Sequence, residues 1–303
     1  MKIMLFALTD TYESLIPKLE EKGYEYKLFN QYSLKGQNLY MAAPKSIEWV
    51  NNEIRKFSPD LIINNMPGLS LPKSHNYTYF GNNEESANLE LHKWETRKKA
   101  ESHGFILPEV LAECHFHDMP PFPHTVYLKS KGRDIFCQSW KVPAGTNMEN
   151  MRNMFVAMCD GHTYPAYVES PVKFDVEGYC QFRVSNNSYT ITEMKGSHGI
   201  LDDYKSVENC IDQDWRKNSW MQDLSPDHYK VFREKCESWL GYVSTLGGNY
   251  EGNIGAAIDE NLNVYWFEQN SRHMTFTTFK GDVDSWIESF TINTDENFWA
   301  LYE

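Results

Sequence analysis

The stretch FEQNSR, residues 267–272, carries the most specific chemical pattern in this sequence of 303 residues. It continues the run NVYW, whose β-branched and aromatic residues predict a strand. Because residues two apart on a strand point to the same face, Glu268, Asn270 and Arg272 should project together. A carboxylate and an amide oxygen are hard ligands that suit Mg²⁺ beside phosphate oxygens, and a guanidinium binds anions. The stretch therefore predicts a sheet edge that holds a magnesium ion at Glu268 and Asn270 and an anion at Arg272.

The region before this edge predicts a helix and several strands. Ser225 is a good N-cap and Pro226 suits the first helical position, so a helix should begin there and end near the glycine pair 247–248. The strands NIGAAID and NVYWFEQN follow it, joined by a short turn. Residues 124–134 and 166–184 also have the composition of strands. The metal-and-anion motif therefore ends the last strand of a region that mixes helices and strands.

The first 75 or so residues predict a small α/β unit. Apolar runs alternate with stretches of helical periodicity, which is typical of a parallel sheet. The expected elements are strands at 2–8, 24–29 and 60–64 and helices at 12–22 and 47–54. The turn after the first strand, LTDTYES, has no glycine cluster, so we do not expect a full dinucleotide-binding Rossmann domain.

Charge and composition narrow the function classes. The formal net charge of −13 argues against a broad cationic surface for duplex nucleic acid. None of the six cysteines forms a CxxC pair, and the first apolar run is too short for a secretory signal, so we expect a reducing cytoplasm. No apolar run approaches the roughly 18 residues that a membrane span needs. We therefore expect a soluble protein that handles small molecules.

Lysines and glutamates recur at element ends upstream of the motif. In FGNNEESANLELHKWETRKKAESHGFILP, which starts at Phe80, we expect one helix from Ser86 to His103, and it carries Lys93. Lys129 ends the strand VYLK. Glu169 ends another strand, and Glu177 follows eight residues later. Taken singly, each is an ordinary surface residue, and it is their succession along the chain that is informative.

In order and spacing these residues resemble the ATP-grasp superfamily, and within it the phosphoribosylamine–glycine ligases. The resemblance runs from about Phe80 to Thr278. The matching positions are Phe80-Gly81, Leu89-Glu90, Lys93, His103, Lys129, Glu169, Glu177, Glu268, Asn270 and Arg272. The resemblance implies an α+β ATP-grasp fold preceded by a small α/β domain. The implied domains are residues 1–78 and 79–303, the second with a lid subdomain at about 107–168 and a C-terminal subdomain at about 169–303.

The resemblance also implies which side chains meet the phosphates of ATP. Lys93 and Lys129 would contact them as point charges. Lys131 would replace Lys129 if the alignment is shifted by two residues. Arg272 and Lys129 are the implied catalytic residues, because they would stabilise the charge on the transferring phosphoryl group and the acyl phosphate.

The remaining implied roles concern adenosine and the metal. Glu169 would face the adenine amino group, and the backbone near Val172 would pair with the adenine edge. Glu177 would accept both ribose hydroxyls, a geometry that a carboxylate can satisfy. Glu268 and Asn270 would hold Mg²⁺. ATP and Mg²⁺ are therefore the implied cofactors.

Several stretches depart from the glycine-ligase pattern. The loop KGRDIFCQSW, residues 131–140, has one glycine where relatives have a glycine-rich flap, and Arg133 could replace lost backbone donors. Residues 255–257 lack the second acid of many ATP-grasp enzymes, an absence that the glycine ligases share. LTDTYES and MKGSHGILDDYKSVEN differ from the family's substrate-binding segments. The departures fall mainly on the acceptor side.

The expected function is an ATP-dependent carboxylate–amine ligase that forms an amide through an acyl phosphate. Its partners would be a small carboxylate and an amine other than that of the glycine ligases, either a modified nucleotide or an amino compound. Two alternatives stay open: an ATP-grasp kinase, and a non-catalytic ATP-binding regulatory protein, which the single-glycine flap favours. The oligomeric state is open as well.

Overall fold

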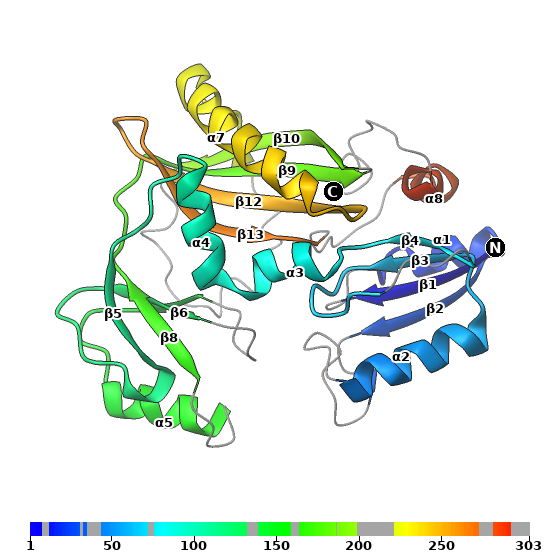
Figure 1. Ribbon diagram of the computed structural model, residues 1–303, viewed down its shortest axis with the longest axis horizontal. Helices are drawn as coiled ribbons and strands as arrows, with labels where there is room; N and C mark the ends of the chain where they lie inside the picture. Colours follow the sequence, from blue (N-terminus) through cyan, green and yellow to red (C-terminus); the bar gives the residue numbers. More distant parts are fainter. Residues whose placement is uncertain are drawn as a thin grey trace.

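The computed structural model describes residues 1–7, 12–30, 33–34, 44–71, 76–131, 139–158, 164–185, 187–198, 221–272 and 281–291. The described elements form three sheets with their covering helices (Figure 1). The strands are β1 (Lys2–Ala7), β2 (Glu25–Asn30), β3 (Leu61–Asn64), β4 (Thr78–Phe80), β5 (Val110–His115), β6 (Val126–Ser130), β7 (Ser139–Val142), β8 (Pro165–Glu169), β9 (Val176–Ser185), β10 (Ser188–His198), β11 (Met221–Gln222), β12 (Tyr250–Ile258) and β13 (Val264–Asn270). The helices are α1 (Ile16–Glu21), α2 (Pro44–Phe57), α3 (Glu84–Leu91), α4 (Lys93–Ser102), the 3₁₀ helix η2 (Phe116–Asp118), α5 (Met148–Met158), α7 (Pro226–Thr245) and α8 (Val283–Thr291).

The first sheet has the order β2-β1-β3-β4, and its neighbouring strands run parallel, as the alternating sequence pattern predicted. Ile3 and Leu5 pack in a core with α1 and α8, whereas Met4 and Phe6 pack in another with α2. A strand buried on both faces must be apolar throughout. That requirement explains why β1 reads as a continuous apolar run.

Helix α8 is far from the first sheet in sequence but shares its core (Figure 1). The rings of Phe80 and Phe290 lie 4.5 Å apart, and those of Tyr12 and Trp286 lie 6.2 Å apart. Lys22 pairs with Asp284 at 2.6 Å. The division into residues 1–78 and 79–303 stays a prediction, but β4 and α8 both lie in the core of the first sheet.

The second sheet forms a separate layer, at the left of Figure 1. Its order is β5-β8-β6-β7, and its pairings are antiparallel. Val126 and Leu128 of β6 pack with Phe155 of α5 and Phe116 of η2 in its core. The sheet carries Lys129 and Glu169 at the ends of adjacent strands, where Glu169 lies opposite Tyr127 and Lys129 opposite Tyr167.

The central sheet, β11-β10-β9-β12-β13, has one apolar and one polar face. Apolar residues such as Cys180, Phe182 and Ile254 pack against α7. The intervening residues point the other way, and we call that side the polar face. The polar face comprises Glu177, Tyr179, Gln181 and Arg183 of β9, Glu251, Asn253 and Gly255 of β12, and Glu268 and Asn270 of β13.

A bulge in β13 sets which residues reach the polar face. Gly255 pairs with Glu268 but Ala256 pairs with Trp266, so Phe267 is an extra residue. Beyond the bulge, Gln269 points to the apolar side, where Trp239 Nε1 donates to its Oε1 at 2.5 Å. The predicted shared face for Glu268 and Asn270 is thereby confirmed.

The single helix predicted from Ser86 to His103 is wrong, because the chain forms two helices there. His92 has φ −113° and ψ 65°, outside the helical region, and separates α3 from α4. Both helices contact β13, and the break lets the chain turn along that strand. The break also places Lys93 in the first turn of α4, facing β13.

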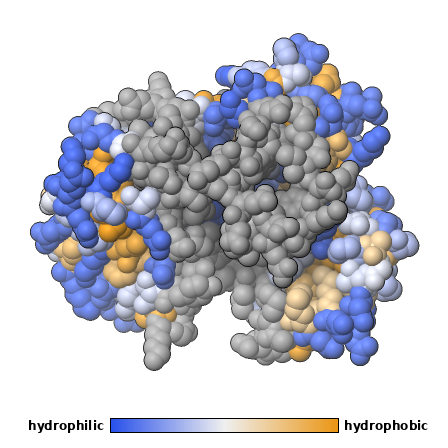
Figure 2. All heavy atoms as spheres, turned by 180° about the vertical axis from the view of Figure 1, so that it is seen from behind, coloured by the Kyte–Doolittle hydropathy of each residue, from blue (hydrophilic) through white to orange (hydrophobic). Residues whose placement is uncertain are grey.

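The surface seen from behind in Figure 2 is mostly hydrophilic over the described residues, with smaller hydrophobic patches between them. None of the helices among the described residues combines the length and the hydrophobicity needed to cross a bilayer.

Candidate functional site

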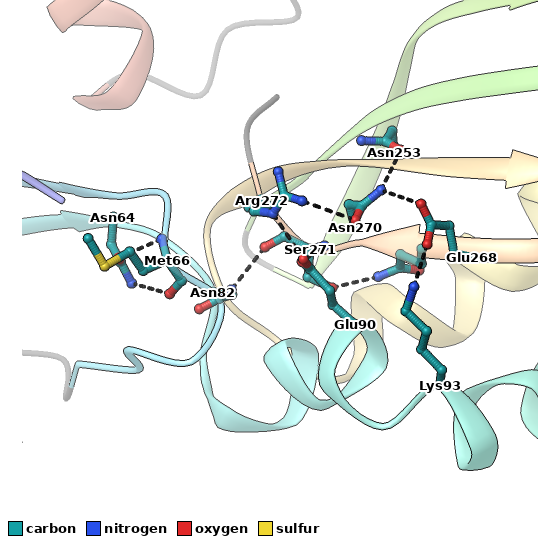
Figure 3. Close-up of polar contacts among 11 residues, drawn as sticks. Asn64, Met66, Asn82, Glu90, Lys93, Asn253, Glu268, Asn270, Ser271 and Arg272 are labelled. Carbon is teal, nitrogen blue, oxygen red and sulfur yellow. Dashed lines mark hydrogen bonds and ion pairs between the residues drawn. The ribbon is translucent and has the colours of Figure 1, made fainter. Parts of the chain in front are cut away.

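Lys93 and Glu268 meet between α4 and β13. Lys93 Nζ donates to Glu268 Oε2 at 2.6 Å (Figure 3). The charge and hydrogen bond of Lys93, helped by the charge of Lys129 and a hydrogen bond from Asn270, lower the pKa of Glu268 to about 2 against the opposing effect of burial. The Glu268 side chain keeps 37% of its surface exposed. It is therefore an ionised carboxylate that a ligand can reach.

A line of hydrogen bonds continues from Glu268 along the polar face. Asn270 Nδ2 donates to Asn253 Oδ1 at 3.1 Å and, more weakly, to Glu268 Oε1 at 3.4 Å. Arg272 Nη2 donates to Asn270 Oδ1 at 3.3 Å. The three residues predicted from FEQNSR thus lie together, in the order carboxylate, amide, guanidinium (Figure 3).

Helix α3 and the segment before it fix the end of this line. Glu90 is 3% exposed; its Oε1 accepts from Arg272 Nε at 2.9 Å and its Oε2 from Ser271 N at 3.0 Å. Asn82 Nδ2 donates to Ser271 O at 2.9 Å. The resemblance gave Glu90 as a matching position without a role, and Asn82 was not predicted. Glutamates are almost never buried unless they are paired. The position of Glu90 between two apolar helix residues, Leu89 and Leu91, is the signal that could have pointed to a buried, paired glutamate.

A buried ionic cluster lies at the other end of the site. Glu169 Oε2 is 2.7 Å from Lys129 Nζ, and its Oε1 is 3.0 Å from Arg97 Nε. Arg97 Nη2 also donates to Pro108 O at 2.6 Å. Lys129 Nζ reaches Phe267 O at 3.4 Å, so the cluster touches β13 one residue before Glu268. Arg97 was missed in the sequence, and the adenine contact of Glu169 stays a prediction.

Lys131 lies apart from these groups. Its Nζ pairs with Glu113 at the surface and sits 4.3 Å from the centre of the Trp94 ring. Lys129 instead turns inward, with 8% of its side chain exposed. Of the two alternatives kept open from the sequence, the geometry brings Lys129 to the site and leaves Lys131 outside it. The flap residues 132–138, including Arg133, lie outside the described residues.

Glu177 and Val172 flank the site near the connection between β8 and β9. Burial raises the pKa of Glu177, the charge of Glu268 raises it further, and a hydrogen bond from Tyr179 opposes both. Val172 lines a cavity of about 530 Å³ between this connection, the start of β5 and the β12–β13 turn. Neither Lys93 nor Glu268 is among the residues that line that cavity. The ribose and adenine roles of these residues stay predictions.

The residues at Glu268 suit a magnesium ion. Glu268 is ionised, and Asn270 Oδ1 keeps a second lone pair beyond its bond to Arg272. The Lys93 ammonium group already shows that a cation is stabilised next to this carboxylate. No cluster of three or more His, Cys, Asp or Glu among the described residues could hold a metal. One carboxylate and one amide would therefore rely on phosphate oxygens and water for the remaining ligands, as Mg²⁺ commonly does.

Solved structures share this architecture. The chain is similar to L-amino acid ligase from Bacillus licheniformis, with a TM-score of 0.56 and 12% identity over 89% of this chain and 66% of that chain. Carboxyaminoimidazole ribonucleotide synthase from Aspergillus clavatus, complexed with ATP, gives 0.55 and 9% over 90% and 70%. The biotin carboxylase domain of Hydrogenobacter thermophilus 2-oxoglutarate carboxylase, with MgADP, ADP and bicarbonate, gives 0.56 and 12% over 89% and 64%. The chain thus spans between 64% and 70% of the length of these proteins.

No protein-family model matches the sequence, and no curated protein matches it either. At 9% to 12% identity the structural similarities establish the fold. The predicted α+β ATP-grasp fold is confirmed.

Proposed function

We propose that this chain is an ATP-dependent carboxylate–amine ligase that works through an acyl phosphate. The observation that carries the proposal is the line Glu268, Asn270, Arg272 with Lys93 at its start, which gathers a carboxylate, an amide and two cations on one sheet edge. The neighbours named as a ligase, a synthase bound to ATP and a carboxylase domain bound to MgADP support it.

The charged residues divide the work of the first step. A substrate carboxylate oxygen attacks the γ-phosphorus of ATP, the bond to the β,γ-bridging oxygen breaks, and ADP and an acyl phosphate form. Lys93 and Lys129 would stabilise the negative charge of the phosphates, and Arg272 would orient the carboxylate and then the acyl phosphate. Glu268 and Asn270 would hold Mg²⁺, which would neutralise part of the negative charge of the phosphates.

The second step forms the amide. The neutral amine of the acceptor attacks the acyl carbon, the C–N bond forms and the C–O bond to phosphate breaks. One amine proton leaves with the phosphate, which departs as hydrogen phosphate. Arg272 would stabilise the leaving phosphate because Glu90 holds its guanidinium in place at 2.9 Å.

The test is to identify what the purified protein makes with Mg-ATP and pooled carboxylates and amines. ADP release that depends on a carboxylate, trapping of the acyl phosphate by hydroxylamine as a hydroxamate, and a product mass equal to both substrates minus water are the expected results. A phosphorylated product would identify a kinase. ATP binding without ADP release from any pool would identify a non-catalytic binding protein.

The finer parts of the proposal rest on the sequence alone. They are the relationship to phosphoribosylamine–glycine ligases, an acceptor different from theirs, and a cytoplasmic location.

A further inference from the structure

Two buried amides on the polar face lie next to the reactive groups and have unused hydrogen-bonding atoms. Gln181 is 7% exposed and Asn253 is 4% exposed. They sit directly opposite each other on β9 and β12. Within the part of the chain that the structure describes, Gln181 Oε1 and Asn253 Nδ2 have no hydrogen-bond partner. A buried polar atom without a partner destabilises the folded state, so such atoms in a native fold call for an explanation.

The orientation of the Asn253 amide follows from its neighbours. Arg272 can only donate, so the Asn270 atom that faces it at 3.3 Å must be oxygen. The Asn270 nitrogen, on the other side of the same amide, then faces Asn253 and the Glu268 carboxylate. Asn253 must therefore turn its oxygen to Asn270, and its Nδ2 is left as a donor. The pair thus offers one donor and one acceptor side by side.

The polar face has room for an added atom next to Asn253. Gly255 follows Asn253 on this face, and among the described residues the nearest atom to a Cβ added there would be Glu268 Cγ, at 4.0 Å. The first sheet lies at the far end of the polar face. There the Arg183 guanidinium lies 5.3 Å from the centre of the Phe80 ring, and burial together with the charge of Glu251 raises the pKa of Tyr12. The amides therefore lie between Asn270 and the first sheet.

The polar groups of this face favour one kind of ligand. Arg183 lies opposite Glu251 in the strand register, and its Nε is 3.4 Å from Glu251 Oε1. Lys195, on the neighbouring strand β10, pairs with Asp223 at 2.6 Å. The amides themselves favour one kind of ligand: a phosphate group presents acceptor oxygens, so it would leave the Gln181 acceptor atom without a partner. A neutral or zwitterionic group that carries an N–H suits the pair better than a phosphorylated one.

We infer that Gln181 and Asn253 form the acceptor subsite of the proposed ligase, and that the acceptor is an α-amino acid or its amide. Gln181 Oε1 accepts from the amine N–H, and Asn253 Nδ2 donates to the carboxylate or carbonyl oxygen on the adjacent carbon. The inference rests on the proposed function, since it gives the amine a position beside Asn270 and Arg272. It also decides between the two acceptors left open by the sequence, in favour of an amino compound over a nucleotide.

Binding rather than turnover tests this subsite. Calorimetry would measure pools of the twenty common amino acids against the full chain with Mg²⁺ and a non-hydrolysable ATP analogue. Each amino acid that binds would then be compared with the same molecule lacking the carboxylate and with the same molecule lacking the amine. We expect both truncated compounds to bind at least about tenfold more weakly, the effect of one lost hydrogen bond.

Two near-isosteric variants remove one contact each. Gln181→Met deletes the acceptor, and Asn253→Asp keeps the oxygen toward Asn270 but replaces the donor. Each should weaken amino-acid binding about tenfold or more. Asn150→Asp, which adds the same charge at an exposed position on α5, should leave binding unchanged. Gln181→Met should melt no lower than the original protein, because it removes an unpartnered buried atom, and a clearly lower melting temperature would show a structural role instead.

The outcomes separate the two proposals. Amino-acid binding that is lost in both variants supports the subsite even if no ADP release is ever found, in which case the ligase proposal fails alone. Equal binding by the variants and the original protein, equal binding of the amine without a carboxylate, or the absence of any amino-acid binding overturns the subsite. ADP release sustained equally by amines without an oxygen would overturn the subsite and leave the ligase proposal intact.

Discussion

Glu169 and Glu268 are both glutamates next to a lysine, yet the structure uses them differently. Glu169 has 4% of its side chain exposed and faces two cations, Arg97 and Lys129. The Glu268 side chain is 37% exposed, and its ion-pair partner among the described residues is Lys93. A buried carboxylate with two cationic partners is not available to a ligand, because its removal would leave both cations buried without a counter-charge. An accessible charge with one partner can exchange that partner for a ligand.

The largest expected effect is on the folding stability of a Glu169 variant. Glu169→Gln should lower the free energy of unfolding by about 3–5 kcal/mol, because Arg97 and Lys129 would stay buried without their shared carboxylate. Urea unfolding at neutral pH would measure it. Glu268→Gln in the same assay should lower the free energy of unfolding less, by about 1–2 kcal/mol, because the pair with Lys93 stabilises the fold but is partly solvated. Equal losses in the two variants would remove the distinction between the two carboxylates.

The second effect concerns turnover, where the order should reverse. Glu268→Gln or Asn270→Ala should lower Mg-ATP turnover by about 100-fold or more, because the proposed metal ligands are lost. ADP release from the folded variants would measure it. Glu149→Gln, at an exposed position on α5, is the matched control and should keep full activity. Full activity in both site variants would refute the metal assignment.

The two lysines near Glu169 provide a third test. Lys129→Ala should weaken ATP binding about tenfold, since a buried cation facing the site would be lost. Lys131→Ala should leave the Kd for ATP within about twofold, because Lys131 pairs with Glu113 at the surface. Calorimetric titration with ATP would compare them. The opposite ranking would mean that the alignment is off by two residues.

The smallest expected effect is on the pH dependence set by Glu177 and Glu268, which share the polar face but shift in opposite directions. The pKa of Glu177 is raised, so its folded state favours the proton, and its contribution to stability should grow as pH falls from neutral. The pKa of Glu268 is lowered to about 2, so its contribution is present above the unfolded value of about 4.3 and is lost as pH falls toward 2.

Urea unfolding and ATP titrations from pH 8 to pH 5 would detect the Glu177 contribution. ATP affinity should fall as pH decreases through the raised pKa, because the ribose hydroxyls need the ionised carboxylate as acceptor. Glu177→Gln should bind ATP more weakly at neutral pH but lose this pH dependence. An unchanged pH profile in that variant would assign the effect to another group.

The local parts of this site were predictable, and its long-range parts were not. The alternation of a strand was enough to place Glu268 and Asn270 on one face, although the bulge at Phe267 left no sign in the sequence. Arg97 looks like a solvated residue of a charged helix, and its burial depends on Glu169, which lies 72 positions away in the chain. Amide partners such as Asn253 are equally invisible, because hydrogen bonds across a sheet depend on register.

The helix break at His92 was missed for a related reason. The polar stretch around it has no proline or glycine to mark an end, so its periodicity reads as one helix. Tertiary contacts with β13 determine the break. By contrast, the parallel first sheet was predictable because a strand buried on both faces leaves a continuous apolar run.

The packing of α8 on the first sheet affects the order in which the protein folds on the ribosome. β1, β2 and β3 emerge early, but Trp286 and Phe290 complete their core and are synthesised more than two hundred residues later. The apolar side of that sheet must stay incomplete while the central sheet and the β5–β8 layer are made. Closing so long a loop adds little entropy cost per extra residue. The first sheet is therefore expected to be among the last parts of the fold to reach its full stability, although its strands precede the other two sheets in the chain.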